Sequence, residues 1–187
     1  ADSVVWLDPE RTLPYELHQY FVNVDDRDVD RFLLQLTLVP VDEVAAVMAE
    51  HGASPDQRLA QHRLADEVCN LVHGVEATER ARLAAQGLFG SELPSGEVLE
   101  ALRGIVPETT LRADALDADD LLVDILVQTG LCSSRGDARR TLAGGGIRIN
   151  GERVPDGMTA LPPGSVVDDR FVLLQKGKRQ RHLLIID

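Results

Sequence analysis

The chain has 187 residues, which is enough for one or two domains with buried cores. Its hydrophobic content of 44% is typical of a globular protein, and it contains no run of about 18 apolar residues, no signal peptide and no lipidation motif. We therefore expect a cytoplasmic protein without a membrane partner. The net charge of −12 argues, over the chain as a whole, against nucleic-acid binding.

The charge is unevenly distributed along the chain. Residues 133–187 carry ten Lys and Arg against six Asp and Glu, whereas residues 1–132 carry nine against 25. Such asymmetry is typical of a basic module attached to an acidic body. Cys69 and Cys132 lack the spacing of metal ligands, which favours reduced thiols.

Helical patterns account for most of the first 90 residues. A short strand is expected at residues 4–7. Thr12 and either Asp25 or Asp26 are expected to cap the first two helices, because short polar side chains accept hydrogen bonds from first-turn amides. Five helices are expected, over about residues 13–21, 26–39, 42–51, 54–73 and 75–88. They predict an all-helical domain over residues 12–90, preceded by a connecting segment over residues 1–11.

The hydrophobic pattern weakens after residue 90 into Pro, Gly and acidic residues. One short helix is expected near residues 97–102. Because so few apolar residues follow a helical or strand period here, we expect residues 91–118 to form a linker.

Residues 121–154 predict two helices followed by a tight hairpin. Ser134 is expected to cap the second helix, which places Arg135 and Arg139 on one face. Arg148 alternates with flanking isoleucines as in a half-buried strand, and the dipeptide at residues 150–151, Asn-Gly, is the strongest short hairpin signal. One face of this segment is therefore expected to pack, and the other to be cationic.

The C-terminal residues predict two more strands. Apolar runs at residues 171–174 and 183–186 flank a basic turn centred on Gly177, which contains both lysines of the chain, Lys176 and Lys178. Together with the preceding helices, these strands predict a small α+β domain over residues 119–187. The expected fold class of the chain is therefore α+β, with the all-helical domain first.

Residues 121–154 resemble the S-four-type RNA-binding module, with matching residue types and spacing. Arginine and lysine clusters bind phosphates whatever the base sequence. Gly136 and Gln175 stand where a basic residue is common in this module, and Arg140 and Arg181 could offset the loss. The expected RNA-binding residues are Arg135, Arg139, Arg140, Arg148, Lys176, Lys178, Arg179 and Arg181. The alternative interpretation is an ordinary solvated helix and hairpin.

The first half of the chain resembles the region that follows the catalytic domain of bacterial tyrosyl-tRNA synthetases. The segments that carry this resemblance are Trp6–Pro9, Pro14–Glu16, Gln19–Phe21, Asp28–Val29, Phe32, Arg58, Ala60–Gln61, Leu64–Ala65 and Leu71–Gly74. The resemblance implies that residues 12–90 contact the anticodon region of the tyrosine tRNA. It also implies that the module over residues 119–187 contacts the stem and long variable arm of that tRNA.

The resemblance further implies that catalysis takes place outside this chain. The Lys-Met-Ser-Lys-Ser type of loop and the dinucleotide fold of the family are not found in the sequence. We therefore expect no cofactor here, with ATP and tyrosine bound by an absent catalytic domain, and no activity of the chain alone. The full-length enzyme is expected to be a homodimer and this chain a monomer.

The residues themselves do not suggest a catalytic or metal site. The five histidines are scattered over different predicted elements, and the aspartates of residues 25–30 fit helix capping better than catalysis. Asp28 and the exposed face of the first two helices are candidates for the anticodon surface. The main alternative function is a free-standing S-four-type RNA-binding or ribosome-associated factor, and an RNA-modifying enzyme is disfavoured.

Overall fold

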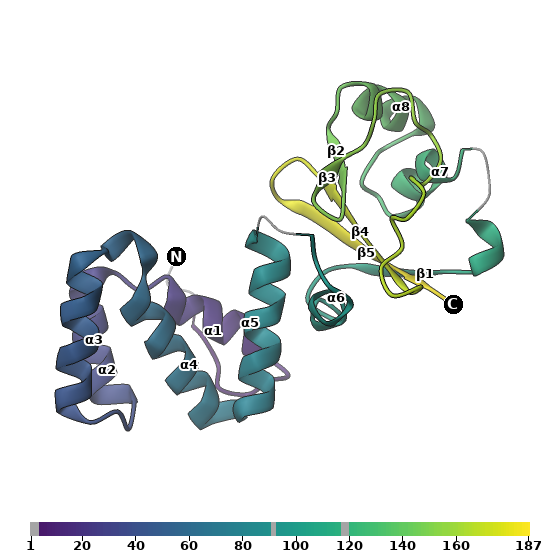
Figure 1. Ribbon diagram of the computed structural model, residues 1–187. Coiled ribbons are helices and arrows are strands. Elements are labelled where there is room, and N and C mark those ends of the chain that lie inside the picture. Colours follow the sequence, from purple (N-terminus) through teal and green to yellow (C-terminus); the bar gives the residue numbers. More distant parts are fainter. Residues whose placement is uncertain (1–3, 91–92, 117–119) are drawn as a thin grey trace. The chain divides into compact units, whose positions relative to one another are not determined.

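The computed structural model describes residues 4–90, 93–116 and 120–187, and the chain divides into two compact units, Ala1–Ala85 and Gln86–Asp187 (Figure 1). The first unit is helical and the second contains a five-stranded mixed sheet, so the predicted α+β class is confirmed. Within the described ranges, no helix is long and apolar enough to cross a membrane.

The first unit contains the five predicted helices, and the boundary between the units falls inside the fifth. Their bounds are α1 (Pro14–Val22), α2 (Asp26–Leu36), α3 (Val41–Ala53), α4 (Leu59–His73) and α5 (Val75–Phe89). The strand expected at residues 4–7 is wrong, because these residues form no regular structure. Thr12 does not cap α1 either. Its hydroxyl oxygen accepts from the Trp6 amide, and Leu13 is the N-cap residue.

The other helix starts are partly as predicted. Asp25 caps α2 by accepting from the Arg27 amide. The start predicted for α4 at residue 54 is wrong, because η1 (Pro55–Gln57) is a single 3-10 turn and Arg58 follows it in the left-handed conformation, with φ 54°. A residue in the left-handed conformation cannot belong to a right-handed helix, so α4 begins only at Leu59.

Apolar side chains from α1, α2 and α4 form the core of the first unit. Leu17 and Phe21 of α1 meet Val29 and Leu33 of α2, and Leu64 of α4 is fully buried among them. Leu17 and Phe21 are four residues apart, as are Val29 and Leu33, so α1 and α2 each bury a single stripe.

The second unit is built around a sheet with the strand order β1-β5-β4-β2-β3. Its strands are β1 (Glu108–Leu111), β2 (Ile147–Ile149), β3 (Glu152–Arg153), β4 (Phe171–Lys176) and β5 (Gln180–Ile186). The edge strand β1 pairs in parallel with β5, and all other pairs are antiparallel.

The segment expected to be a linker, residues 91–118, contributes α6 (Gly96–Ala101), β1 and the single turn η2 (Ala113–Ala115) to the second unit. The short helix near residue 97 is confirmed. Leu99 and Leu102 are fully buried, and β1 has only one buried residue, Leu111. A short strand with one buried side chain has no visible alternation, which is why the sequence pattern appeared weak here.

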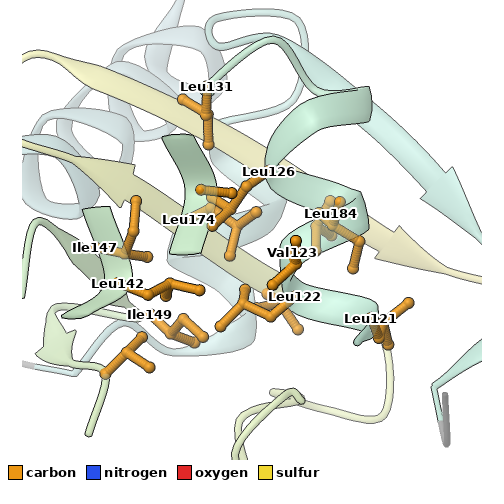
Figure 2. Close-up of a cluster of buried hydrophobic side chains, with 14 of the residues drawn as sticks. Leu121, Leu122, Val123, Leu126, Leu131, Leu142, Ile147, Ile149, Leu174 and Leu184 are labelled. Carbon is orange, nitrogen blue, oxygen red and sulfur yellow. The ribbon is translucent and has the colours of Figure 1, made fainter. Parts of the chain in front are cut away.

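Two helices cover one face of this sheet, α7 (Leu121–Gln128) and α8 (Arg135–Ala143). Their apolar side chains meet those of the strands in the cluster that Figure 2 shows. The labelled members are Leu121, Leu122, Val123, Leu126, Leu131, Leu142, Ile147, Ile149, Leu174 and Leu184. On the opposite face, α6 packs against β4.

Candidate nucleic-acid interface

The start of α8 is held by reciprocal polar contacts. The Ser134 hydroxyl oxygen accepts from the Asp137 amide at 3.2 Å, as predicted for the N-cap. The Asp137 carboxylate in turn accepts from the amide of Ser133 at 3.0 Å, and this bond keeps the pKa of Asp137 below its usual value. Ala138 and Leu142 are buried against the core, so Arg135 and the other arginines of α8 remain exposed.

Arg135 and Arg139 converge on one carboxylate of the neighbouring helix. An oxygen of Asp120 lies 2.6 Å from Nη2 of Arg139 and 3.1 Å from Nη2 of Arg135. Asp124 lies 3.1 Å from Nη1 of Arg135. The shared face of the two arginines agrees with the sequence pattern, whereas the two acidic partners were not predicted.

Three of the expected cations make bonds within the second unit. Lys176 of β4 donates to the Leu131 carbonyl at 2.6 Å and lies 3.7 Å from Asp137. Arg148 donates to the carbonyl of Gly151 at 2.9 Å. Arg181 donates to the carbonyls of Lys178 and Leu88. These bonds tie β4, the β2–β3 hairpin and β5 to their surroundings, so Lys176 and Arg181 are only half-exposed.

The remaining expected cations are exposed and form no ion pair with the described residues. Lys178 and Arg179 lie in the turn between β4 and β5, where Gly177 has φ 62°, and Arg140 lies on α8. Among the residues that the structure describes, no carboxylate lies within ion-pair distance of these three side chains. They are therefore the cations most available to an external anion.

A further arginine extends the cationic surface of the sheet. The β2–β3 register pairs Arg148 with Arg153, and the next registers pair Arg148 with Gln175 and Gln175 with Arg181. These side chains form one row across four strands, because residues that pair directly point to the same side of a sheet. Arg153 was missed from the sequence, although a two-residue turn at residues 150–151 implies its pairing with Arg148.

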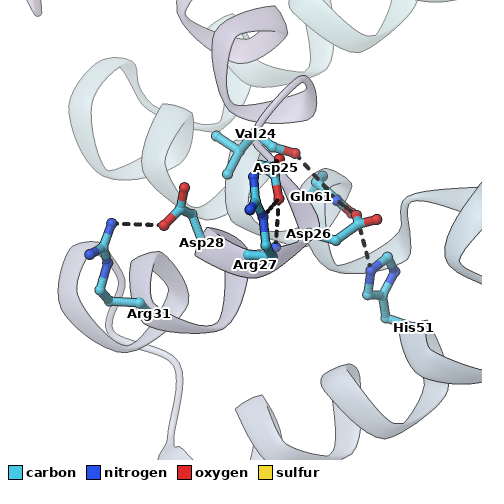
Figure 3. A network of polar contacts seen from close by, with 8 residues as sticks. All are labelled: Val24, Asp25, Asp26, Arg27, Asp28, Arg31, His51 and Gln61. Atoms are coloured by element: carbon cyan, nitrogen blue, oxygen red, sulfur yellow. Dashed lines mark hydrogen bonds and ion pairs between the residues drawn. The ribbon is translucent and has the colours of Figure 1, made fainter.

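In the first unit, the connection between α1 and α2 is held by side chains from α3 and α4 (Figure 3). Arg58 donates to the Val22 carbonyl at 2.9 Å. The buried Gln61 amide donates to the Val24 carbonyl and to the Asp26 carboxylate, and Nε2 of His51 lies 3.4 Å from the same carboxylate. The three residues that link the two helices, 23–25, are thus fixed from one side.

The other side of this connection borders an open hollow of about 470 Å³. Its lining consists of Gln19, Tyr20, Asn23, Val24, Asp25, Asp28 and Phe32. The Tyr20 side chain is 45% exposed, and Asp28 pairs with Arg31 at 2.9 Å. Hydrogen bonds from Arg27 lower the pKa of Asp25 to about 2, so its carboxylate is charged at neutral pH. The hollow thus combines an exposed aromatic ring with hydrogen-bond acceptors.

Comparison with known proteins places both units in one family. Residues 1–90 match the family model "tRNA synthetases class I (W and Y)", and residues 98–184 match "Tyrosine--tRNA ligase SYY-like C-terminal domain". The chain is 42% identical over 185 residues to the Tyrosine--tRNA ligase of Anaeromyxobacter dehalogenans, covering 97% of this chain and 44% of that protein. It is 40% identical over 186 residues to that of Roseiflexus castenholzii, with the same coverage.

The alignments leave more than half of each relative unmatched, since the chain spans only about 44% of their length. The two family models match in succession along the chain and together span most of it. This chain belongs to the tyrosyl-tRNA synthetase family and corresponds to its C-terminal region.

Proposed function

We propose that this chain is the tRNA-binding portion of a tyrosine–tRNA ligase and recognises the tyrosine tRNA for aminoacylation. The observation that carries the proposal is the group of exposed cations without an ion pair among the described residues, Arg140, Lys178 and Arg179, on a unit that matches the C-terminal domain of these ligases. These three side chains lie in residues 133–187, where the positive charge of an otherwise acidic chain is concentrated. Phosphate contacts of this kind supply most of the sequence-independent affinity of a protein for RNA.

The second unit, with its resemblance to the S-four-type module, is proposed to contact the stem and long variable arm. Lys178 and Arg179 at the tip of the β4–β5 turn would reach one phosphate strand, and Arg140 another. Arg148 and Arg153 on the sheet add a second row of donors. Lys176 and Arg181 would act mainly by holding the strands that carry these side chains.

The hollow at the α1–α2 connection is proposed to receive an unpaired base of the anticodon. Stacking of a base on an aromatic side chain contributes about 1–3 kcal/mol, and the half-exposed Tyr20 ring offers such a surface. Asp28 can accept hydrogen bonds from a base edge, because its carboxylate is half-exposed beside Arg31. Clamping of the connection by Arg58 and Gln61 would hold the hollow in shape before RNA binds.

The remaining functional assignments concern the protein beyond this chain. Tyrosine and ATP are proposed to bind the part of the relatives that the match leaves out, so this chain should not catalyse tyrosine-dependent pyrophosphate exchange. We propose that the chain alone is a cytoplasmic monomer. The match of residues 1–90 to a class I synthetase model disfavours a free-standing RNA-binding factor.

Binding of a tyrosine tRNA transcript to the whole chain at several salt concentrations tests the phosphate contacts. Replacing Lys178 or Arg179 by Ala should weaken binding and lower the slope of log affinity against log salt by about 0.7–0.9 for each lost cation. Arg112→Ala is the matched control, since Arg112 is exposed in the same unit but paired with Asp114. Unchanged slopes in the Lys178 and Arg179 variants would refute the phosphate contacts.

The anticodon contact needs a different measurement. Asp28→Asn should reduce the preference for the tyrosine tRNA over a transcript with a substituted anticodon and leave the salt slope unchanged, because a base contact releases no counterion. Asp30→Asn, on the same helix and exposed, is the control. Equal discrimination by wild type and Asp28→Asn would exclude Asp28 from anticodon recognition.

A further inference from the structure

We infer that Asp120 limits RNA binding at α8 by occupying the arginine pair Arg135 and Arg139, for which its carboxylate competes with RNA phosphates. This inference rests on the proposed function of the second unit. It concerns the arginines of α8 and is separate from the exposed cations of the β4–β5 turn.

The position of the Asp120 carboxylate is the first observation. Asp120 is the N-cap residue of α7, where an aspartate side chain usually accepts from a first-turn amide. Here it makes no such hydrogen bond and accepts instead from Arg135 and Arg139. The carboxylate therefore serves the arginines of α8 rather than its own helix.

The geometry of the pair is the second observation. One Asp120 oxygen lies within 3.1 Å of guanidinium nitrogens from both arginines. An oxyanion bridging two guanidinium groups is the arrangement in which arginines bind a phosphate. Asp120 thus occupies a place that an RNA phosphate could take, and the side chains remain open to solvent, with Arg135 55% and Arg139 54% exposed.

The surrounding charges strengthen this effect. Asp124 also pairs with Arg135, and Asp137 lies near Lys176. Asp120 and Asp124 thus neutralise the positive charge of Arg135 and Arg139. An RNA phosphate can bind the arginine pair only by displacing Asp120, or by sharing the arginines with it against electrostatic repulsion.

This cost affects different RNAs unequally. A tRNA held by contacts with several parts of the chain presents its phosphate to the arginine pair at high effective concentration, and so can displace the carboxylate. A flexible RNA without such contacts can bind through Lys178 and Arg179 and leave the arginine pair with Asp120. Asp120 therefore lowers the affinity for the proposed tRNA by the full cost of displacing the carboxylate, and the affinity for generic RNA by at most the same amount.

Asp120→Asn in the whole chain tests this inference, with poly-U as the generic RNA and a tyrosine tRNA transcript beside it. Removing one charge at contact distance in water should raise poly-U affinity by about fivefold. The poly-U salt slope should rise by about 0.7 for each arginine that becomes engaged. For tRNA, the slope should stay the same, because the arginines are already engaged, and the affinity should rise by at least the same factor.

Two variants serve as controls for this test. Asp114→Asn removes a carboxylate from another exposed ion pair of the same unit and should leave poly-U binding unchanged. Replacing both Arg135 and Arg139 by Ala should abolish the effect of Asp120→Asn, since the residue acts through these arginines. Circular dichroism melting of each variant would verify that the second unit remains folded.

The outcomes separate the inference from the proposed function. Poly-U binding that is unchanged or weakened by Asp120→Asn would overturn the inference, whatever happens with tRNA. Tyrosine tRNA binding that is insensitive to Lys178→Ala and Arg179→Ala would overturn the proposed phosphate contacts, whatever happens with poly-U. A poly-U gain that persists without Arg135 and Arg139 would show a general charge effect and would also overturn the inference.

Discussion

Replacing Gln61 by Leu is expected to destabilise the first unit by about 1–2 kcal/mol. The side chain is fully buried, and Leu has a similar volume, so the change leaves little cavity. It removes a hydrogen bond to the Asp26 carboxylate, and a bond to a charged group contributes about 1.5–3 kcal/mol. The bond to the Val24 carbonyl is long, at 3.4 Å, and adds little.

One opposing effect reduces this cost. Oε1 of Gln61 is buried and has no hydrogen-bond partner among the described residues. Leucine removes this unpaired oxygen and so recovers part of its desolvation penalty. The net loss is therefore placed at the lower end of the range for a charged hydrogen bond.

The fluorescence of Trp6 reports the unfolding of the first unit, which also contains Gln61. Trp6 is the only tryptophan of the chain, it lies in the first unit, and the Arg11 guanidinium carbon is 3.2 Å from its ring centre. With a urea dependence of about 1–2 kcal/mol per molar, the unfolding midpoint should fall by about 1 M. Gln35→Leu, at an exposed position of α2, should change the midpoint little. Equal unfolding midpoints for wild type and Gln61→Leu would refute a stabilising role of the Gln61 hydrogen bonds at the α1–α2 connection.

The remaining predictions concern the stability of the second unit, measured by circular dichroism. Ser134→Ala should cost about 1 kcal/mol, because it removes the N-cap hydrogen bond of α8, and full stability in this variant would count against the cap. Gly145→Ala should cost about 1 kcal/mol, because Gly145 has φ 64°. Gly136→Ala should instead stabilise the unit by about 0.5 kcal/mol or more, because Gly136 lies in α8 and an added methyl group would meet no atom at short distance. Changes of the same sign in both variants would contradict this reasoning. Burial keeps the pKa of His182 below 6.5, so the folded unit keeps the ring neutral beside Thr109 while the unfolded chain takes up a proton. The contribution of His182 to the free energy of unfolding should therefore be fully present above pH 6.5. It should decrease below pH 6.5 by up to about 1.4 kcal/mol per pH unit, and His182→Gln should remove this part of the pH dependence.

The sequence by itself determined the features that depend on neighbouring residues. The five helices of the first unit follow from apolar residues three and four positions apart, and the cap at Ser134 follows from the bonding of short polar side chains to nearby amides. For α2 the sequence left Asp25 and Asp26 as alternatives, and the structure selects Asp25. The hairpin after Ile149 follows from its Asn-Gly turn, which also fixes the pairing of Arg148 with Arg153. The cationic character of residues 133–187 needs only a count of charges.

Only the tertiary structure decided which charges are compensated and which segments join the sheet. Asp120 reaches Arg135 and Arg139 from 15 and 19 positions away, and the Gln61 side chain reaches Val24 across 37 positions. Such contacts depend on how the helices pack, so the pattern of neighbouring residues in the sequence does not predict them. The edge strand β1 is formed by residues that looked like a linker, because pairing with β5, more than 70 residues later, supplies the hydrogen bonds that its own pattern does not reveal.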